Sequence, residues 1–193
     1  MMKKLFVLAV SLMMTLMANA QASVQAGFML NTLDTEIGAG RLSGKYKGFM
    51  LTGDYNIHFT DYLGVAPGLG IDYSFNNAGG LQYKELGLLL PIDVNYRIPV
   101  GNSLSLSIFV GPTLYYGLFA KEYSFNPPYD YYEYDSKRFD VSLGGGVWLD
   151  IVESIRVKVG YKFGLLNTSK IDGIKEKASC FTVSIGYVFG QDD

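Results

Sequence analysis

Hydrophobic and small residues alternate along residues 63–75, which read LGVAPGLGIDYSF. The even positions are small or polar, and three of the six are glycine. The odd positions carry the larger apolar side chains: Leu63, Val65, Pro67, Leu69, Ile71, Tyr73 and Phe75. This period of two predicts an extended strand with one apolar face and one crowded face. A glycine-rich face suits the interior of a narrow barrel better than a face in water, so we expect the apolar face to contact lipid.

Seven further segments show the same alternation, which predicts eight strands in all. A tilted strand needs about ten residues to cross a bilayer. In chain order, the predicted strands are residues 23–32, 46–59, 63–75, 83–98, 104–116, 138–151, 155–164 and 178–189. Pro67, Pro91 and Pro112 lie inside predicted strands. Because proline has no backbone N–H, we expect a bulge or distorted pairing at each of them.

The predicted connections alternate between long and short. The short turns are expected at residues 60–62, 99–103 and 152–154. The longer loops are expected at residues 33–45, 76–82, 117–137 and 166–177. Outer-membrane barrels have short periplasmic turns and longer external loops. The sequence therefore predicts an all-β fold, an eight-stranded antiparallel up-and-down transmembrane β-barrel, with both termini in the periplasm.

Aromatic residues on the predicted outward faces gather near the strand ends, and aliphatic residues occupy the middle. Those near the predicted loops are Phe49, Tyr73, Phe75, Tyr116, Phe139 and Phe163. Those near the predicted turns are Phe59, Tyr96, Tyr187 and Phe189. Aromatic rings favour the headgroup zone of a bilayer, so these two sets predict the girdles at its two interfaces.

The first twenty residues have the features of an export signal. Lys3 and Lys4 precede an apolar run over residues 5–17, and Ala18, Asn19 and Ala20 match a small-residue cleavage site. We therefore expect residues 1–20 to be a cleavable signal peptide and residues 21–193 to form the barrel domain. Cleavage would change the formal net charge from −2 to −4. The apolar run is too short for a spanning helix.

Composition excludes several classes of protein. Charged residues make up 18% of the chain, against about 25% in typical soluble domains. The single cysteine, Cys180, cannot form an internal disulfide. The mild negative charge and the lack of a basic stripe argue against nucleic-acid binding.

Four segments resemble a known family. They read YKELGLLLPIDVNYRI, FVGPTLYY, DVSLGGGVWLDI and VKVGYKFGLLN. Together they resemble small Bacteroides-type outer-membrane β-barrel proteins, the porin-like or PorT-like barrel domains, over nearly the whole mature chain. The resemblance implies a barrel in the outer membrane of a Gram-negative bacterium. These motifs are barrel patterns, so they imply fold and location more strongly than biochemical role.

Charged residues on the inward faces predict a network that fills the lumen. An eight-stranded barrel is just wide enough for its own side chains, and buried charges must be paired. The predicted network consists of Asp54, Asp72, Glu85, Asp93, Arg97, Asp140, Asp150, Arg156, Lys158 and Lys162. Counting outward from the turn at residues 152–154 places Asp150 opposite Arg156.

Candidate catalytic and metal-binding residues are scarce. The only histidine, His58, is expected to face inward near a periplasmic turn, as a packed or hydrogen-bonded lumen residue. One histidine and one cysteine cannot supply a metal cluster. Gly144, Gly145 and Gly146 lie within a predicted strand and do not match a phosphate loop. We therefore expect no enzymatic activity, no metal and no cofactor.

The longest predicted loop is the best candidate for contact with the exterior. After Pro127 and Pro128 it interleaves tyrosines with acidic residues: Tyr129, Asp130, Tyr131, Tyr132, Glu133 and Tyr134. Tyrosine, with an apolar body and a polar tip, suits recognition. A simpler alternative is that this loop covers the barrel mouth or leans on lipopolysaccharide.

The function predicted from the sequence is that of a monomeric outer-membrane barrel with a structural, surface-interaction or envelope-accessory role. Its expected partners are outer-membrane lipid, lipopolysaccharide, the barrel assembly machinery and an extracellular or envelope protein. Two alternatives stay open. One is a narrow porin that passes small solutes or ions. The other is a soluble periplasmic carrier whose apolar face would line the barrel and bind an apolar ligand.

Overall fold

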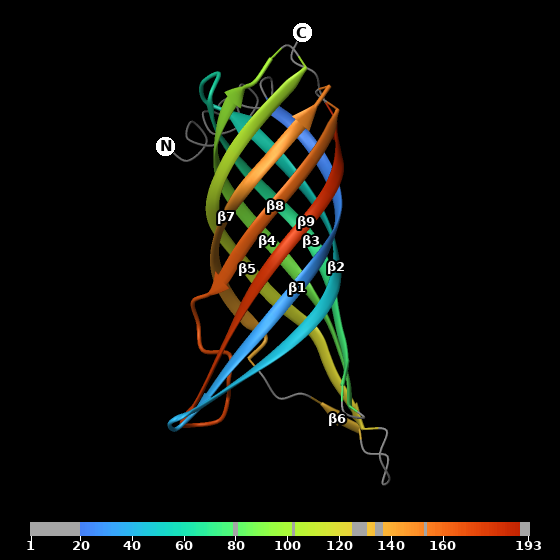
Figure 1. The fold of residues 1–193 in the computed structure, drawn as a ribbon, viewed down its shortest axis with the longest axis vertical. Coiled ribbons are helices and arrows are strands. Elements are labelled where there is room, and N and C mark those ends of the chain that lie inside the picture. The colour runs from blue at the N-terminus through green and yellow to red at the C-terminus, as the bar shows by residue number, and fades with distance from the viewer. Residues whose placement is uncertain are drawn as a thin grey trace, which may run out of the picture.

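The computed structural model describes residues 20–78, 81–101, 103–124, 131–133, 137–152 and 154–189. Within these ranges, eight long antiparallel strands form a closed ring, and one short strand lies beside it (Figure 1). In chain order they are β1 (Ala20–Ile37), β2 (Gly40–His58), β3 (Leu63–Ala78), β4 (Leu81–Pro99), β5 (Leu104–Ser124), β6 (Tyr131–Glu133), β7 (Phe139–Ile151), β8 (Ile155–Gly164) and β9 (Ile174–Phe189). The described ranges contain no helix long and apolar enough to cross a membrane.

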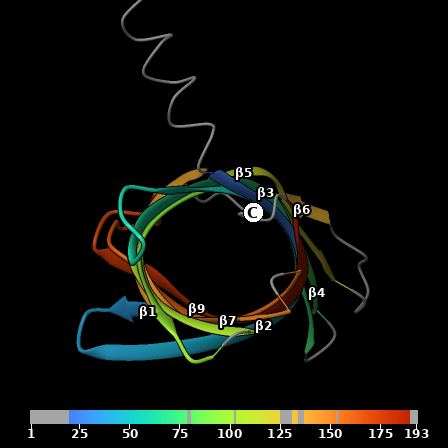
Figure 2. The same ribbon diagram turned by 90° about the horizontal axis from the view of Figure 1, so that it is seen from above.

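Each long strand pairs with the long strands before and after it in the chain, and β1 pairs with β9. Pairing of β4 with β5 completes the ring, which Figure 2 shows along its axis. The short strand β6 pairs with the end of β5. The predicted eight-stranded up-and-down barrel is thus confirmed. A closed ring leaves no long strand edge with unpaired backbone groups in lipid.

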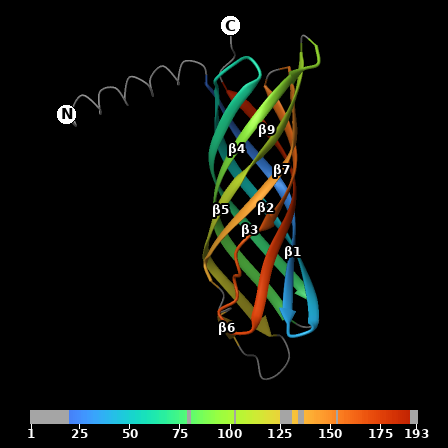
Figure 3. The ribbon, with the colours of Figure 1, turned by 90° about the vertical axis from the view of Figure 1, so that its left-hand side faces the viewer.

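The two ends of the barrel differ. The turn end carries the start of β1, the end of β9 and the three short connections at residues 59–62, 100–103 and 152–154. The loop end, opposite, carries the remaining connections, and the β1–β2 hairpin extends beyond the body of the barrel there (Figure 3). These two names are used for the two ends below.

The apolar rows point outward. Leu69 and Ile185, for example, are 59% and 60% exposed, whereas the inward residues Trp148 and Arg156 are each 1% exposed. A soluble protein has the opposite distribution, with polar residues outside. Outward aliphatic rows and a polar, glycine-rich interior are typical of a barrel whose outer solvent is lipid.

Strand lengths at the loop end differ from the prediction. Residues 33–45 were expected to form a loop, but β1 and β2 continue to a turn at residues 38–39, where Gly38 has a positive φ of 58°. The loop expected at residues 76–82 is also shorter, because β3 ends at Ala78 and β4 begins at Leu81. Beyond the bilayer, water surrounds both faces of a strand. Alternation then fades although backbone pairing continues.

The same correction applies to the two other predicted loops. Within residues 117–137, β5 continues to Ser124 and β6 adds three residues beside it. The pairing of β4 with β5 shifts register between Leu86 and Gly87, and the two strands stay paired beyond this irregularity as far as Leu81 and Ser124. The loop expected at residues 166–177 ends at Ile174, where β9 begins.

The pairing is distorted at each proline, as predicted, and the interruption affects one neighbouring strand only. Pro67 pairs with Ile92 of β4 but has no partner on β2. Pro91 likewise pairs with β5 but not with β3, and Pro112 with β7 but not with β4. A missing N–H removes a hydrogen bond toward one neighbour, and the ladder resumes in the same register beyond it.

Candidate functional site

An ion cluster fills the lumen toward the turn end, with Arg156 of β8 at its centre. The Nε and Nη2 atoms of Arg156 donate to the two carboxylate oxygens of Asp150 at 2.7 and 3.1 Å, and Nη1 donates to Asp54 at 3.3 Å. Asp150 lies opposite Arg156 in the β7–β8 register, as the sequence predicted. Two-point guanidinium–carboxylate pairing is strong and geometrically specific.

Two aromatic rings pack against this ion cluster. Trp148 of β7 and Phe109 of β5 stack with centroids 5.4 Å apart and planes inclined by 25°. The Arg156 guanidinium lies 4.6 Å from the centroid of the Trp148 ring. The Lys158 Nζ atom lies 4.2 Å from the Phe109 centroid and 2.6 Å from a carboxylate oxygen of Asp93. Each cation is thus held by at least one carboxylate and a ring face, which compensates for lost hydration.

These seven side chains are referred to below as the lumen plug: Asp54, Asp93, Phe109, Trp148, Asp150, Arg156 and Lys158. They come from β2, β4, β5, β7 and β8 and so link strands on different sides of the ring. Trp148 and Arg156 are among the most deeply buried side chains described.

Buried amides and hydroxyls pack beside the plug. Gln25 donates to Ser23 at 3.1 Å and to Asp54, and it accepts a bond of 3.1 Å from Ser184. Asn95 donates to Asn56 at 2.8 Å. Asn56 Nδ2 lies 3.0 Å from Nε2 of His58, which accepts the bond because the amide nitrogen can only donate. This arrangement matches the hydrogen-bonded lumen role expected for the histidine.

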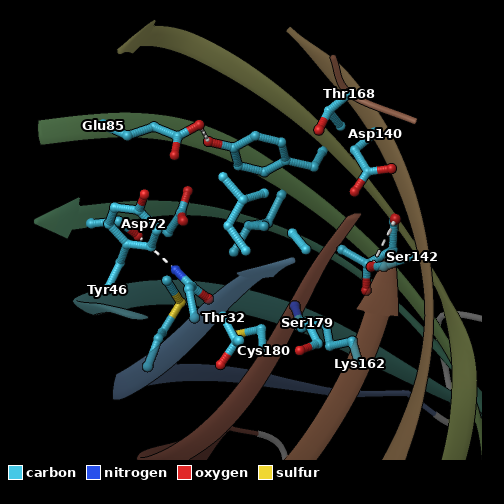
Figure 4. A pocket seen from close by; sticks show the side chains of 18 of the residues that line it. Thr32, Tyr46, Asp72, Glu85, Asp140, Ser142, Lys162, Thr168, Ser179 and Cys180 are labelled. Atoms are coloured by element: carbon cyan, nitrogen blue, oxygen red, sulfur yellow. Dashed lines mark hydrogen bonds between the residues drawn. The ribbon is translucent and has the colours of Figure 1, made fainter. Parts of the chain in front are cut away.

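The lumen is more open toward the loop end. A cavity of about 150 Å³ lies there, lined by the side chains that Figure 4 shows. A smaller cavity of about 50 Å³ lies beside residues of the plug. Leu89, Thr113 and Lys162 line both. The charged side chains around the larger cavity are Asp72, Glu85, Lys137, Asp140, Lys162 and Glu176. The lining thus contains four carboxyl groups and two ammonium groups.

Two tyrosine hydroxyls form hydrogen bonds with a glutamate on one side of this cavity. Tyr115 and Tyr83 donate to the two oxygens of Glu85 at 2.6 and 2.8 Å. The Tyr115 ring covers Gly87, where an added Cβ would lie 2.1 Å from a ring carbon. Glycine at this position therefore lets the ring lie against the wall and reach Glu85. Neighbouring Asp72 is 6% exposed.

The ten charged residues predicted as one network fall into two groups and one separate residue. Five belong to the lumen plug: Asp54, Asp93, Asp150, Arg156 and Lys158. Four line the loop-end cavity: Asp72, Glu85, Asp140 and Lys162. The half-buried Arg97, near the turn end, forms no ion pair with another described residue. Charged side chains in the densely packed half of the lumen must form ion pairs, because burial removes their hydration. Charged side chains around the cavity can be hydrated instead.

The network predicted from the sequence contained charged residues only and left out the aromatic side chains of the lumen. Phe109 and Trp148 stack inside the plug, and Tyr83 and Tyr115 face the cavity. The alternation of β5 could have predicted an inward Phe109, because this residue lies on the same face of the strand as Ser107 and Gly111.

The predicted contact loop is only partly described. Tyr129, Asp130 and Tyr134 lie outside the described residues. Tyr131, Tyr132 and Glu133 form β6, opposite Tyr123, Glu122 and Lys121 of β5. This part of the candidate loop is thus a short strand added to a projecting hairpin.

Candidate metal ligands do not gather in the part of the chain that the structure describes. No group of three or more His, Cys, Asp or Glu side chains in it is placed to hold a metal ion. Cys180, the single cysteine, lines the loop-end cavity as a free thiol.

Solved structures with this fold include two bacterial surface proteins. The attachment invasion locus protein Ail of Yersinia pestis is 17% identical with a TM-score of 0.54, covering 89% of this chain and 99% of Ail. Neisserial surface protein A is 13% identical with a TM-score of 0.50, covering 87% of this chain and 97% of that protein. At such identities the likeness concerns the fold.

Sequence comparison gives the family. No curated protein matches the chain. The profile of the family described as outer membrane protein beta-barrel domain matches residues 6–189. Since this match spans nearly the whole sequence and the chain folds as a closed ring with an apolar exterior, the protein belongs to the outer-membrane β-barrel domain family.

Proposed function

We propose that this protein is a non-conducting, non-enzymatic outer-membrane barrel that presents its loop-end hairpins at the cell surface as an interaction scaffold. The observation that carries the proposal is the lumen plug. The family membership supports the membrane location, and the plug and the hairpins support the role within it.

The plug favours a closed barrel over the narrow porin. A solute leaving the loop-end cavity toward the turn end would meet Trp148 and Arg156, each 1% exposed. Displacing Arg156 would separate it from Asp150 and Asp54 in a low-dielectric interior, and breaking a buried ion pair costs several kcal/mol. Thermal motion at this cost opens a passage too rarely for steady conduction.

The outward apolar rows favour a membrane barrel over the soluble carrier. A carrier of apolar ligands would need an apolar lining. The larger cavity instead exposes carboxylates and tyrosine hydroxyls, whereas aliphatic side chains such as Leu69 and Ile185 lie outside.

The strand lengths support the surface role. β1, β2, β4 and β5 have 18 to 21 residues, about twice what a tilted strand needs to cross a bilayer. The excess lies at the loop end, where Ile37 and Leu42 near the β1–β2 turn are 49% and 67% exposed. A paired hairpin is a stiffer support for a partner than a free loop. A further structure of Ail contains a bound heparin analogue, sucrose octasulfate, with 14% identity and a TM-score of 0.52, covering 89% of this chain and 99% of Ail. A barrel of this kind can thus carry a ligand.

The proposal includes an orientation and a processing step. The loop end faces the exterior and both termini face the periplasm, because outer-membrane barrels carry their longer connections outside. Residues 1–20 are removed as a signal peptide. The folded chain is a monomer of the PorT-like type, inserted by the barrel assembly machinery, and its hairpins meet an extracellular or envelope protein.

Conductance in planar bilayers tests the closed lumen. The wild-type chain is expected to give no large stable conductance, whereas the Trp148→Ala variant gains measurable openings because a buried indole leaves the plug. Val147→Ala, one residue away but facing lipid, is the matched control and is expected to behave like wild type. A large stable conductance of the wild-type barrel would refute the closed lumen.

An epitope inserted at Gly38 tests the orientation. An antibody is expected to bind it on intact cells, because the β1–β2 turn lies outside the membrane. If the epitope becomes accessible only after the outer membrane is opened, the orientation and the surface role are wrong.

A further inference from the structure

The loop-end cavity has an acid and a base on opposite walls. Asp72 of β3 and Lys162 of β8 both line it. In the ring, three strands separate β3 from β8 in either direction, so these two strands lie on opposite sides of the lumen. Figure 4 shows Asp72 and Glu85 on one side of the cavity and Lys162 and Ser142 on the other. Among the ion pairs of the described residues, none joins Asp72 to Lys162.

The acid has an oxygen atom without a partner. Asp72 is 6% exposed, and its Oδ1 atom accepts no hydrogen bond from any described residue. Glu85, by contrast, accepts a tyrosine hydroxyl at each of its two oxygens. Asp140 accepts a bond of 2.7 Å from the backbone N–H of Val141. A buried polar atom without a partner is costly, so a hydrogen-bond donor that enters the cavity would be stabilised at Asp72.

The base has donors to spare. Lys162 is half-buried, and no carboxylate of the described residues lies within ion-pair distance of its Nζ atom. The other lysine of the cavity, Lys137, is exposed and donates to the backbone oxygen of Asn167 at 3.2 Å. Ser142 lies close to Lys162, because Gly144, two residues along β7, is opposite Lys162 in the register. An ammonium group and a hydroxyl thus face the cavity together.

We propose that the loop-end cavity binds a small zwitterion of the α-amino acid type, with its ammonium group at Asp72 and its carboxylate at Lys162 and Ser142. A ligand with only a positive charge would leave Lys162 without a counter-charge, and a ligand with only a negative charge would leave Asp72 without one. The described residues offer no group of metal ligands, so the cation that pairs with Asp72 is an ammonium group.

The rest of the cavity suits an apolar side chain. Met29, Leu33 and Leu89 line it. A volume of about 150 Å³ has room for about ten groups of the size of a water molecule. This is close to the number of non-hydrogen atoms in leucine, and we therefore expect an amino acid of about this size.

The cavity adjoins the loop-end opening of the barrel. Two of its lining residues, Lys137 and Thr168, belong to connections at the loop end, whereas the lumen plug fills the other half. A ligand therefore enters from the loop end. That this ligand comes from outside the cell rests on the orientation proposed above.

The test is isothermal titration calorimetry of the folded full-length mature chain in neutral detergent with L-leucine. Binding is expected in the micromolar to millimolar range. Two analogues isolate the charged groups: isoamylamine lacks the carboxylate, and isocaproic acid lacks the ammonium group. Each should bind on the order of tenfold to a hundredfold more weakly than L-leucine, because each loses hydrogen bonds to a charged group of the protein.

The variants Asp72→Asn and Lys162→Gln test the two partners separately. Each should weaken the binding of L-leucine on the order of tenfold or more. In D72N, L-leucine and isocaproic acid should bind alike, because the ammonium group has lost its acceptor. In K162Q, L-leucine and isoamylamine should bind alike. The controls Asp34→Asn and Lys175→Gln make the same changes at the loop end but outside the cavity lining and should bind like wild type.

Three outcomes would overturn the proposal. The first is that wild type does not bind L-leucine at millimolar concentrations, and the second is that either analogue binds as tightly as L-leucine. The third is that D72N and K162Q bind L-leucine no more weakly than the two controls. Heat-modifiable mobility on a gel confirms the folding of each variant before titration. Because the titration depends neither on conductance nor on orientation, its failure is distinguishable from failure of the proposed function.

Discussion

The two halves of the lumen are built by the same strands yet have different contents. Toward the turn end, Arg156 and Lys158 are enclosed by carboxylates and by the rings of Trp148 and Phe109. Toward the loop end, Lys162, four residues beyond Lys158 on the same face of β8, lines a cavity of about 150 Å³. Burial makes pairing obligatory, whereas a cavity lets water take the place of a partner. A narrow barrel can thus be filled by side chains along one half of its lumen and hold a cavity along the other half.

The largest expected difference between the halves concerns the cations of β8. Arg156→Met should lower the free energy of unfolding by about 3–5 kcal/mol, because Asp150 and Asp54 stay buried without their cation. Lys162→Met, at the cavity, should cost about 1 kcal/mol or less, since its surroundings can be hydrated. Urea titrations in lipid vesicles measure both. Similar losses in the two variants would contradict the division of the lumen.

Glycine-to-alanine substitutions compare how tightly the barrel wall is packed in the two halves of the lumen. An added Cβ at Gly146 would lie 2.1 Å from the backbone oxygen of Val159, and backbone cannot move aside easily. Gly146→Ala should therefore cost about 1–3 kcal/mol. At Gly87 the added Cβ meets the Tyr115 ring, which can swing into the cavity, so Gly87→Ala should cost about 1 kcal/mol or less. Unfolding in vesicles, measured for both, should rank them in this order, and the reverse ranking would show that the loop-end wall is the tighter one.

The smallest expected effect lies in the tyrosine pair at the cavity. Tyr115→Phe removes one hydrogen bond to Glu85 and should cost about 1 kcal/mol or less, because water can donate in its place. The same unfolding assay applies, and a loss of several kcal/mol would mean that Glu85 is sealed from solvent.

The sequence predicts the membrane-spanning part of the fold best, because contact with lipid restricts which residues can face outward. Alternation predicted the outward and inward faces and the three short turns, because a residue on the wrong face of a lipid-facing strand is strongly disfavoured. The missing N–H of Pro67, Pro91 and Pro112 predicted distorted pairing at these positions. Alternation fails beyond the bilayer, where residues 33–45 have no apolar environment on either side. There the β1–β2 hairpin continues although its pattern is lost.

The lumen contacts are only partly visible in the sequence. Asp150 and Arg156 are adjacent in register across a short turn, so their pairing follows from counting. Lys158 and Asp93 lie on β8 and β4, which are not neighbours in the ring. Their 2.6 Å contact crosses the lumen and depends on the stagger of all the intervening strands. That Arg97 lies apart from the two groups of charged residues likewise depends on the stagger of the strands.

The most direct test of a barrel filled at one end and open at the other is thiol labelling of two matched cysteines. In a Cys180→Ser background, Ser142→Cys lines the loop-end cavity, and Ser107→Cys lies beside the plug, where the native serine is 2% exposed. A small charged thiol reagent added to the folded barrel should label position 142 faster than position 107 by about two orders of magnitude, because reaching position 107 requires an opening that costs a few kcal/mol. Equal rates at the two positions would contradict the account.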